Sequence, residues 1–243
     1  MDKALIISPI GCDPYFDDLY DKENHWRFTK PERTYELLAI VYNDYEPPEG
    51  TYDYLIRRRG KKYNMIPEIC KEFNWQDYDY IGCWDDDYAT DIKSVNTALQ
   101  IARENDFRVF QQSVISWNTY PCLVNDPKLL FTETNFVEVG VPFFRNDIFR
   151  KMLRFLNDYN YPDTTSWGLD KILCYYLQNT AHVVHASTIK HMKEETTAYS
   201  KDQGFREMDY LMRDFFPKYM KEKFNIDYSY FDRQYVINSW SKE

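Results

Sequence analysis

Short apolar runs of strand length alternate along the chain with segments whose apolar residues recur at helical spacing. The expected strands are 4–8, 35–44, 51–58, 78–84, 108–116, 135–144 and 182–187, and the expected helices are 63–74, 90–105, 146–156, 166–179 and 205–224. Continuous apolar runs are typical of strands that are buried on both faces. Because such strands alternate with helices, the order predicts an α/β fold in which helices flank a mixed, mostly parallel central sheet.

Three residues bear on where these helices begin and end. Thr90 is the expected N-cap of the helix at 90–105, since its hydroxyl can accept a hydrogen bond from an amide of the first turn. Pro67 has no amide hydrogen to donate, so the helix around it is expected to begin close by. For the same reason Pro217 is expected to interrupt the helix at 205–224.

Net charge and glycine content exclude several classes of protein. The 243 residues carry a formal net charge of -9 and only 7 glycines. This acidic balance disfavours a protein that binds nucleic acid mainly by neutralising phosphates. Neither GxGxxG nor GxxxxGKS/T occurs, so a dinucleotide-binding fold and a Walker-type NTPase have no support. One basic run at 57–62 predicts either a local positive groove or a solvated loop.

The chain has no internal repeat, low-complexity tract or linker-like stretch that would divide it. Residues 1–200 are expected to form the main domain, and 201–243 a C-terminal helical extension packed on the same domain. The five cysteines form no CxxC pair, which favours a reducing, cytoplasmic setting over a disulfide framework or a zinc site. The apolar run at 4–8 is too brief for a secretory signal, and no apolar run is long enough to predict a membrane span.

Asp85, Asp86 and Asp87 follow directly on the expected strand at 78–84. On an extended chain Asp85 and Asp87 would point to one side and Asp86 to the other. Two carboxylates held together repel each other, and a hard cation such as Mg²⁺ or Mn²⁺ relieves that repulsion while also binding phosphates. Ligands of open α/β sheets bind at the carboxyl ends of strands, which favours a metal site. The alternative is a solvated acidic turn.

A second constellation lies further along the chain. Asp170 is expected in the first turn of the helix at 166–179, and His191 follows the expected strand at 182–187. Each has an ordinary alternative, because Asp170 can simply complement the helix dipole and His191 can be a surface histidine. Taken in order with the aspartates, they give a pattern of acidic cluster, helix-opening acid and closing histidine.

Four blocks in this order resemble one family. They are "DYIGCWDDDY" (79–88), "FVEVGVPFFRND" (136–147), "WGLDKILCYYLQ" (167–178) and "HVVHASTIKH" (182–191). The pattern is similar to that of GT-A glycosyltransferases, which use nucleotide sugars. It most resembles an uncharacterised group with plant and bacterial members, known as a domain of unknown function with WDxD and WGLD motifs. The chain departs from many members in being shorter at its N-terminus.

This resemblance implies a single GT-A-like, Rossmann-like domain that binds a donor nucleotide across the first strand ends. The donor-binding residues that it implies are Ser8, Pro9, Ile10, Asp44, Lys61, Lys62, Asp85 and Asp86. In this scheme the first three would line the base, Asp44 would bind base or ribose, and the lysines would add positive charge near the diphosphate.

The resemblance also implies a divalent metal ion, Mn²⁺ or Mg²⁺. Asp87 would bind it directly, and Asp85 would contact the ribose or a metal-bound water. The expected ligand set is Asp87, Asp85 and His191. Either His185 or His191 fits the closing histidine. His191 is preferred because it lies beyond the expected strand, in a loop position.

Sugar transfer needs an acceptor hydroxyl made more nucleophilic, and a carboxylate that takes its proton also lies near the positive charge that develops on the sugar. Asp170 is the expected base, with Glu138 in reserve. A base on the face opposite the leaving group would invert the anomeric configuration, and inversion is the expected outcome. Without such a base the configuration can be retained. Trp84 and Trp167 are candidates to stack on sugar rings, with core packing as the alternative.

Other functions stay open at this point. A metal-dependent phosphoesterase or nuclease also uses clustered aspartates and histidines, but needs a second metal ion. A non-catalytic module that binds a sugar or nucleotide would keep the pocket without turnover. For a transferase, the expected partners are a nucleotide-sugar donor and a glycan acceptor, with a modified base in DNA as the alternative acceptor. The sequence leaves the donor sugar and the oligomeric state open.

Overall fold

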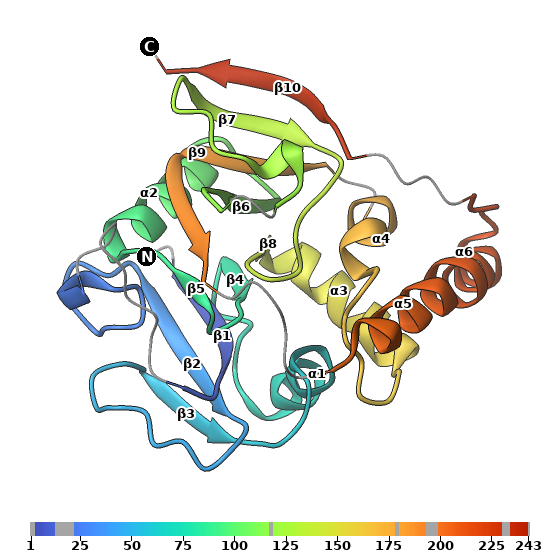
Figure 1. Cartoon of the computed structure of the whole chain (residues 1–243), viewed down its shortest axis with the longest axis horizontal. Helices are drawn as coiled ribbons and strands as arrows, with labels where there is room; N and C mark the ends of the chain where they lie inside the picture. The colour runs from blue at the N-terminus through green and yellow to red at the C-terminus, as the bar shows by residue number, and fades with distance from the viewer. Residues whose placement is uncertain are drawn as a thin grey trace.

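The strands of the central sheet carry apolar residues on both faces. The computed structural model describes residues 3–12, 22–116, 119–177, 180–192, 199–229 and 234–242. Its strands are β1 (Ala4–Ile10), β2 (Tyr35–Val41), β3 (Tyr54–Arg57), β4 (Tyr80–Cys83), β5 (Tyr88–Ala89), β6 (Val109–Val114), β7 (Leu129–Thr134), β8 (Phe143–Arg145), β9 (Ala181–His191) and β10 (Val236–Ser241). The sheet order is β10-β7-β9-β6-β8-β4-β1-β2-β3, and β5 pairs with β9 off this path. Figure 1 shows this sheet at the centre of the molecule.

The sheet is mixed, as the sequence predicts. Strands β4, β1, β2 and β3 are parallel, and so are β6 and β9, whereas β8 joins the two groups by antiparallel pairs. Because two antiparallel pairs separate β4 from β6, the strands of both groups run in the same direction. Their carboxyl ends therefore meet at one edge of the sheet, where ligands of open α/β sheets bind.

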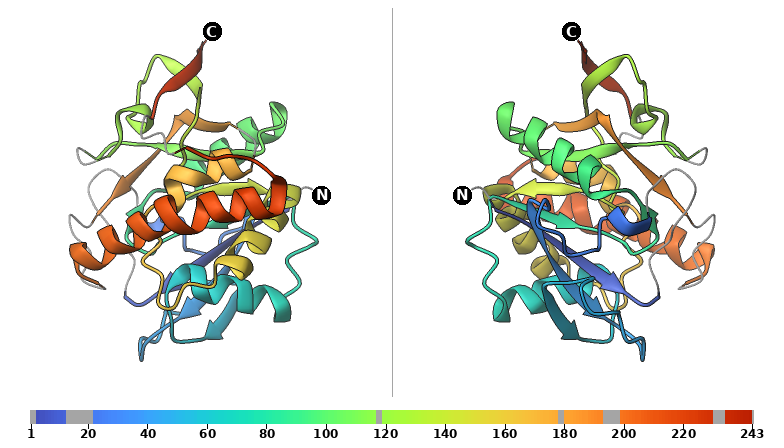
Figure 2. Two further views of the ribbon diagram at one scale, coloured as in Figure 1. Left: turned by 90° about the vertical axis from the view of Figure 1, so that its right-hand side faces the viewer. Right: turned by 90° about the vertical axis from the view of Figure 1, so that its left-hand side faces the viewer.

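Helices cover both faces of the sheet. They are α1 (Lys62–Glu72), α2 (Ile92–Glu104), α3 (Asn146–Tyr159), α4 (Leu169–Tyr176), α5 (Lys201–Tyr210) and α6 (Phe216–Phe224), with short 3-10 turns at Lys22–Asn24 (η1) and Pro121–Leu123 (η2) and a π-helical turn at Leu211–Phe215 (η3). Figure 2 shows α5 and α6 in front of the sheet from one side and α2 in front of it from the other. These layers confirm the predicted α/β architecture.

Side chains along β1 alternate between two hydrophobic cores, one on each face of the sheet. Leu5 and Ile7 pack with residues of α1, α3, α4 and α6, while Ala4 and Ile6 pack with residues of α2. All four side chains are fully buried. Strand side chains point alternately to opposite faces, so a strand between two helical layers must be apolar at every position. This requirement explains the continuous apolar runs that make the strands recognisable in the sequence.

The strand expected at 135–144 is wrong over most of its length. Residues 135–142 form an irregular segment, and β8 begins only at Phe143. The carbonyls of Gly140 and Pro142 accept hydrogen bonds from the amides of Asp85 and Cys83. Pro142 has no amide to return, so a regular ladder cannot extend through it. The strand expected at 182–187 is longer than predicted, because β9 continues to His191.

Two expectations about helix ends are also corrected. The N-cap of α2 is Asp91, whose carboxylate accepts a hydrogen bond from the amide of Ser94, whereas the Thr90 hydroxyl donates to the Thr188 carbonyl. Pro67 lies inside α1, which begins five residues earlier at Lys62. Pro217 does mark an irregularity: the π-helical turn η3 ends just before it, and α6 begins at Phe216.

The C-terminal segment contains both helix and strand. Side chains of η3 and α6, among them Leu211 and Phe216, belong to the same buried cluster as Leu5 of β1. After α6 the chain returns to the sheet, where β10 pairs antiparallel with β7 at one edge. The boundary proposed at residue 200 stays a prediction. Within the described residues, no helix has the combination of length and apolarity needed to cross a bilayer.

Candidate active site

A cavity of about 930 Å³ lies at the edge of the sheet where the carboxyl ends of β1, β4 and β9 meet. The chain reaches it with Pro9 of β1, with Asp85–Asp87 just after β4, and with His191 at the end of β9. The segments 138–140 and 163–171 form further parts of its wall. The topology thus brings together the acidic cluster, the reserve acid, the helix-opening acid and the closing histidine.

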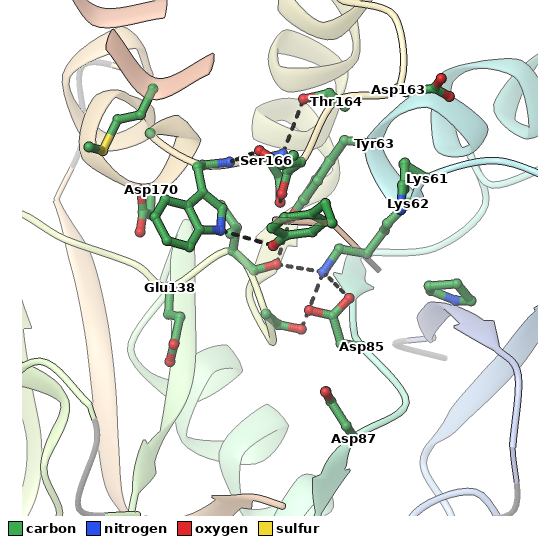
Figure 3. Close-up of a pocket in the computed structure, with 18 of the residues that line it drawn as sticks. Lys61, Lys62, Tyr63, Asp85, Asp87, Glu138, Asp163, Thr164, Ser166 and Asp170 are labelled. Atoms are coloured by element: carbon green, nitrogen blue, oxygen red, sulfur yellow. Dashed lines mark hydrogen bonds and ion pairs between the residues drawn. The ribbon is translucent and has the colours of Figure 1, made fainter. Parts of the chain in front are cut away.

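Lys62 and Asp85 form a mostly buried ion pair beside the cavity. The Lys62 ammonium lies 2.8 Å from a carboxylate oxygen of Asp85, and its side chain is only 7% exposed. It also donates to the carbonyl of Val139 at 2.7 Å, and a longer contact of 3.4 Å joins it to the Cys83 carbonyl. Figure 3 shows the contact between Lys62 and Asp85 as dashed lines. One ammonium therefore joins the start of α1, the end of β4 and the 138–140 segment.

Burial and the neighbouring charges bring the pKa of Asp85 towards neutral pH. Burial raises the pKa of Asp85 to about 6, with Lys62 lowering it and Asp87 raising it. Desolvation disfavours the charged form, and only the ammonium opposes that effect strongly. The carboxyl of Asp85 thus changes charge around pH 6.

Asp86 and Asp87 point in different directions because they lie in a turn, not in a strand. A carboxylate oxygen of Asp86 accepts a hydrogen bond from the Gly11 amide at 2.8 Å, which ties the turn to the end of β1. A carboxylate oxygen of Asp87 lies 3.4 Å from Nε2 of His191. Strand β4 ends at Cys83, so the alternation expected for Asp85, Asp86 and Asp87 does not continue through them.

Histidine 191 lies at the cavity, and His185 does not. His191 is the last residue of β9, not a loop residue, and its ring stacks on Tyr88 with centroids 4.6 Å apart. Burial lowers the pKa of His191, but its hydrogen bond and charge interaction with Asp87 outweigh that effect and raise it. His185 is buried: one ring nitrogen accepts from the Asp126 amide and the other contacts the Thr132 hydroxyl. Of the two histidines, only His191 is placed to reach a bound ligand.

Glu138 and Asp170 approach the cavity from its other side, as Figure 3 shows. Burial raises the pKa of Glu138 to about 7, His191 lowers it and Asp170 raises it again. The Oε2 atom of Glu138 is buried and has no hydrogen-bond partner in the part of the chain that the structure describes. Asp170 lies in the first turn of α4, as expected. The two acids share a wall of the cavity and interact electrostatically.

The residues expected to bind the donor are placed unevenly. Pro9, Lys61 and Lys62 line the cavity, together with the three aspartates after β4. Ser8 and Ile10 are fully buried within β1 and do not line it. Asp44 lies outside the cavity, with its side chain 98% exposed and 3.5 Å from Arg59. Their roles toward a donor stay predictions.

The basic run does not form a free positive surface. Arg57 pairs with Glu46, Arg58 with Glu72 and Arg59 with Asp44. Each guanidinium thus has an acidic partner, which lowers the attraction of this segment for phosphates. Trp84 is also accounted for, because it is fully buried between Trp26 and Phe143 in the core.

Sequence reasoning missed Tyr88 and Gly140. Tyr88 stacks on His191, and its hydroxyl hydrogen-bonds Glu138, which lowers the pKa of that carboxyl. A Cβ atom at Gly140 would lie 2.5 Å from the Tyr88 hydroxyl, so a side chain there would displace the tyrosine. Tyr88 directly follows the aspartates, but only the antiparallel pairing of β5 with β9 brings it opposite His191. A single sequence carries no direct signal for that pairing.

The residues at the cavity are suited to a divalent cation that the protein and a substrate bind together. In the residues that the structure describes, no three His, Cys, Asp or Glu side chains gather closely enough to hold a metal ion by themselves. Asp87 and His191 nevertheless present an oxygen and a nitrogen 3.4 Å apart. Mg²⁺ is commonly bound by one or two protein groups plus substrate phosphates and water.

The topology, the two helical layers and the cavity at the strand ends define a GT-A-like α/β fold. The solved structures that resemble the chain include the crystal structure of S. aureus TarS 1–349 in complex with UDP-GlcNAc. It has a TM-score of 0.51 and 12% sequence identity, and the match covers 87% of this chain and 65% of that chain. A197 from STIV matches with a TM-score of 0.40 and 16% identity, over 84% of this chain and 92% of that one. No protein-family model and no curated protein sequence matches the chain.

Proposed function

We propose that the protein is a glycosyltransferase that moves a sugar from a nucleoside diphosphate sugar to an acceptor hydroxyl. The observation that carries this proposal is the cavity itself. Lys62, Asp85 and Asp87 lie on one side of it, and Glu138 and Asp170 lie on another. Cationic and metal-binding groups facing carboxylates suit a reaction in which a diphosphate leaves as a hydroxyl loses its proton. The GT-A-like fold and the UDP-GlcNAc bound to TarS support a nucleotide-sugar donor.

Asp87 and His191 are the proposed ligands of a Mn²⁺ or Mg²⁺ ion that is shared with the donor diphosphate. The ion would stabilise negative charge on the leaving diphosphate. Asp85 is held by Lys62, so we assign it to the donor ribose or to a water on the ion. Lys61 lines the cavity and adds positive charge near the diphosphate.

Asp170 is the proposed general base, with Glu138 as the alternative. In the transfer step the acceptor oxygen forms a bond to the anomeric carbon and its proton passes to the carboxylate. The bond from the anomeric carbon to the diphosphate oxygen breaks, and the diphosphate leaves with that electron pair. A base on the side opposite the diphosphate leads to inversion of configuration. Glu138, whose pKa is raised to about 7, is suited to hold a proton near neutral pH.

The test is release of nucleoside diphosphate from a panel of nucleotide sugars in the presence of Mn²⁺. We expect release with at least one donor, and its loss on adding EDTA. Asp87→Asn should reduce turnover by at least about 100-fold while the thermal unfolding midpoint stays close to that of the wild type. Asp227→Asn, an exposed change outside the cavity, is the matched control and should keep wild-type turnover.

Two results would contradict the proposal. A protein that binds UDP but releases nothing with any donor and acceptor would be a binding module. An Asp87→Asn variant with full, EDTA-sensitive turnover would remove Asp87 from the metal site. Asp170→Asn separates the two candidate bases, since loss of a base lowers kcat far more than it weakens donor binding.

A further inference from the structure

A group of aromatic side chains from residues 120–205 lines the same cavity. Its members are Tyr120, Trp167, Tyr199 and Phe205. The Phe205 side chain is 53% exposed, and its ring meets that of Trp167 edge to face with centroids 4.9 Å apart. A large apolar side chain that stays so exposed at the mouth of a cavity loses the benefit of burial. A ligand that covers it would restore that benefit.

Trp167 is held firmly in this group. Its indole nitrogen donates a hydrogen bond to the Tyr199 hydroxyl at 2.9 Å. Gly204 of α5 packs directly against the ring, because a Cβ atom there would lie 2.5 Å from ring carbon Cδ2. A glycine inside a helix is unfavourable relative to alanine. Its presence at this position is explained by the close approach of α5 to the indole.

The loop that carries Trp167 is held in a costly backbone conformation. Asn160, Asp163, Ser166 and Gly168 all have positive φ angles, between 32° and 91°. Asn160 is the left-handed C-cap of α3, and Asn and Asp tolerate this region, but for Ser166 it costs on the order of 1 kcal/mol. Such strain persists only where neighbouring groups fix the loop, and it is concentrated at ligand-binding sites.

The group that fixes the loop is the buried carboxylate of Glu207 on α5. It accepts hydrogen bonds from the Thr164 hydroxyl and from both the amide and the hydroxyl of Thr165. On the other side of the loop, the side-chain oxygen Oδ1 of Asn64 accepts a hydrogen bond from the backbone amide of Thr164 at 2.9 Å. The loop is thus tied both to α5 and to α1. This preorganised wall would lower the entropy cost of binding a ligand against it.

Charges of both signs lie near the aromatic group, so the described residues there do not form the continuous positive surface that a polyanion needs. Asp163 and Asp170 line the same cavity. The ammonium groups of Lys61 and Lys171 lie 5.4 Å and 5.9 Å from the ring centroids of Tyr199 and Tyr120, within the range of cation–π contacts. The three arginines of the basic run are paired with acidic residues. Carboxylates repel phosphates but accept hydrogen bonds from hydroxyl groups.

From these observations we infer that Trp167 and Phe205 form the acceptor subsite and that it takes a neutral carbohydrate. Calling this an acceptor subsite rests on the proposed transferase function. Carbohydrate binding at the subsite can nevertheless be measured without any transfer. The apolar face of a sugar ring packs on the indole, and its hydroxyl groups donate to Asp170, three residues along the chain. DNA, the other macromolecule considered, is disfavoured because Asp163 and Asp170 oppose the attraction of the nearby lysines for its phosphates.

Binding is tested without a donor, so the result does not depend on turnover. Chitotriose and maltotriose are titrated by calorimetry against the full chain, its Trp167→Ala and Phe205→Ala variants, and the control Trp240→Ala. Trp240 is exposed on β10 and does not line the cavity. At least one trisaccharide should bind the wild type and Trp240→Ala alike, and both cavity variants should bind it about tenfold more weakly. UDP with Mn²⁺ should bind all four proteins within about twofold.

The outcomes separate this inference from the proposed function. Phe205→Ala alters an exposed side chain, so it should fold even if Trp167→Ala does not. Absence of trisaccharide binding, binding that the cavity variants leave unchanged, or equal loss of UDP affinity would overturn the acceptor subsite. Tighter binding of duplex DNA containing 5-hydroxymethylcytosine than of either trisaccharide would also overturn it. Failure to cleave any nucleotide sugar would instead contradict the transferase and leave the trisaccharide result standing.

Discussion

Lys62 is the single residue on which the geometry of the site depends most directly. Its ammonium pairs with Asp85 and also donates to the carbonyl of Val139, next to Glu138. The sequence places two lysines side by side at 61 and 62, but it does not indicate that one is buried and the other is not. That difference arises at the start of α1, because Lys61 is the extended N-cap residue whereas Lys62 opens the helix and reaches the carbonyl of Cys83 at the end of β4.

Lys62→Met should leave Asp85 without its counter-charge. The pKa of Asp85, about 6 in the wild type, should then rise, because Lys62 is the main group that lowers it. The acid limb of the pH–activity profile, measured as diphosphate release, should move to higher pH. Since Asp85 is partly exposed, the loss of stability should be only about 1–3 kcal/mol. Lys71→Met, an exposed change on the same helix, should alter neither quantity. An unshifted profile for Lys62→Met would contradict the assignment.

The buried carboxyl of Glu138 determines the direction in which the free energy of unfolding changes with pH. Burial raises its folded-state pKa from 4.5 to about 7, so the folded protein holds this proton at pH values where the unfolded chain has lost it. Stability therefore falls as pH rises from about 4.5 to 7. Glu138→Gln removes this penalty. The variant should therefore gain stability over the wild type at pH 8, by up to about 3 kcal/mol more than at pH 4.5. Thermal unfolding of both proteins across this range is the measurement.

The matched control for Glu138 is Glu133, whose pKa moves the other way. Hydrogen bonds from Thr180 and Asn238 lower the pKa of Glu133. Its charged form therefore supports folding above its unfolded-state pKa, and that support is lost as pH falls through the lower folded-state value. Glu133→Gln should thus destabilise the protein at pH 8. If both variants changed stability with the same sign, burial of Glu138 would not be the cause.

At the scale of elements, α5 and the loop before α4 act as one unit through Gly204. If helix propensity alone mattered, Gly204→Ala would stabilise α5 by about 1 kcal/mol. In this protein the new Cβ atom would lie 2.5 Å from the Trp167 ring, so the indole must move. We expect a lower unfolding midpoint and a changed tryptophan fluorescence spectrum. Arg206→Ala, at an exposed position of the same helix, should change neither. A more stable Gly204→Ala variant with an unchanged spectrum would show that α5 does not press on the ring.

The elements predicted correctly are those whose burial leaves a pattern in the sequence. Strand β1 is buried on both faces and gives an unbroken apolar run. Strands β7 and β10 were missed, because β10 is exposed at every position and β7 mixes apolar with polar residues. The segment 135–142 was taken for a strand because its apolar residues resemble one, although Pro142 interrupts the ladder.

The same reasoning explains what was predicted at the site. Residues in the cavity that carry charge, such as Asp87 and Asp170, could be singled out because their chemistry is visible in the sequence. Tyr88, Gly140 and Glu207 could not, since their roles depend on which strand pairs with β5 and on how α5 packs. Side-chain partners that are distant in sequence are set by tertiary packing, which a single sequence does not encode locally.

At the scale of the whole molecule, the cavity depends on both ends of the chain. Pro9 of β1 and Phe205 of α5 line it together, although almost the entire chain separates them. The buried cluster on that face of the sheet likewise joins Leu5 of β1 to Leu211 and Phe216. We therefore expect the C-terminal helices to unfold together with the sheet, in one cooperative transition.

The test compares one large truncation in each helical layer. Phe216 of α6 and Leu99 of α2 are both fully buried, on opposite faces of the sheet. Phe216→Ala and Leu99→Ala should each cost about 2–5 kcal/mol, and each should lower a single unfolding midpoint reported alike by far-UV and near-UV circular dichroism. UDP binding with Mn²⁺ should protect both variants, because the ligand binds only the folded cavity. A separate early transition in Phe216→Ala, with UDP affinity retained after it, would mean that the C-terminal helices form an independent unit.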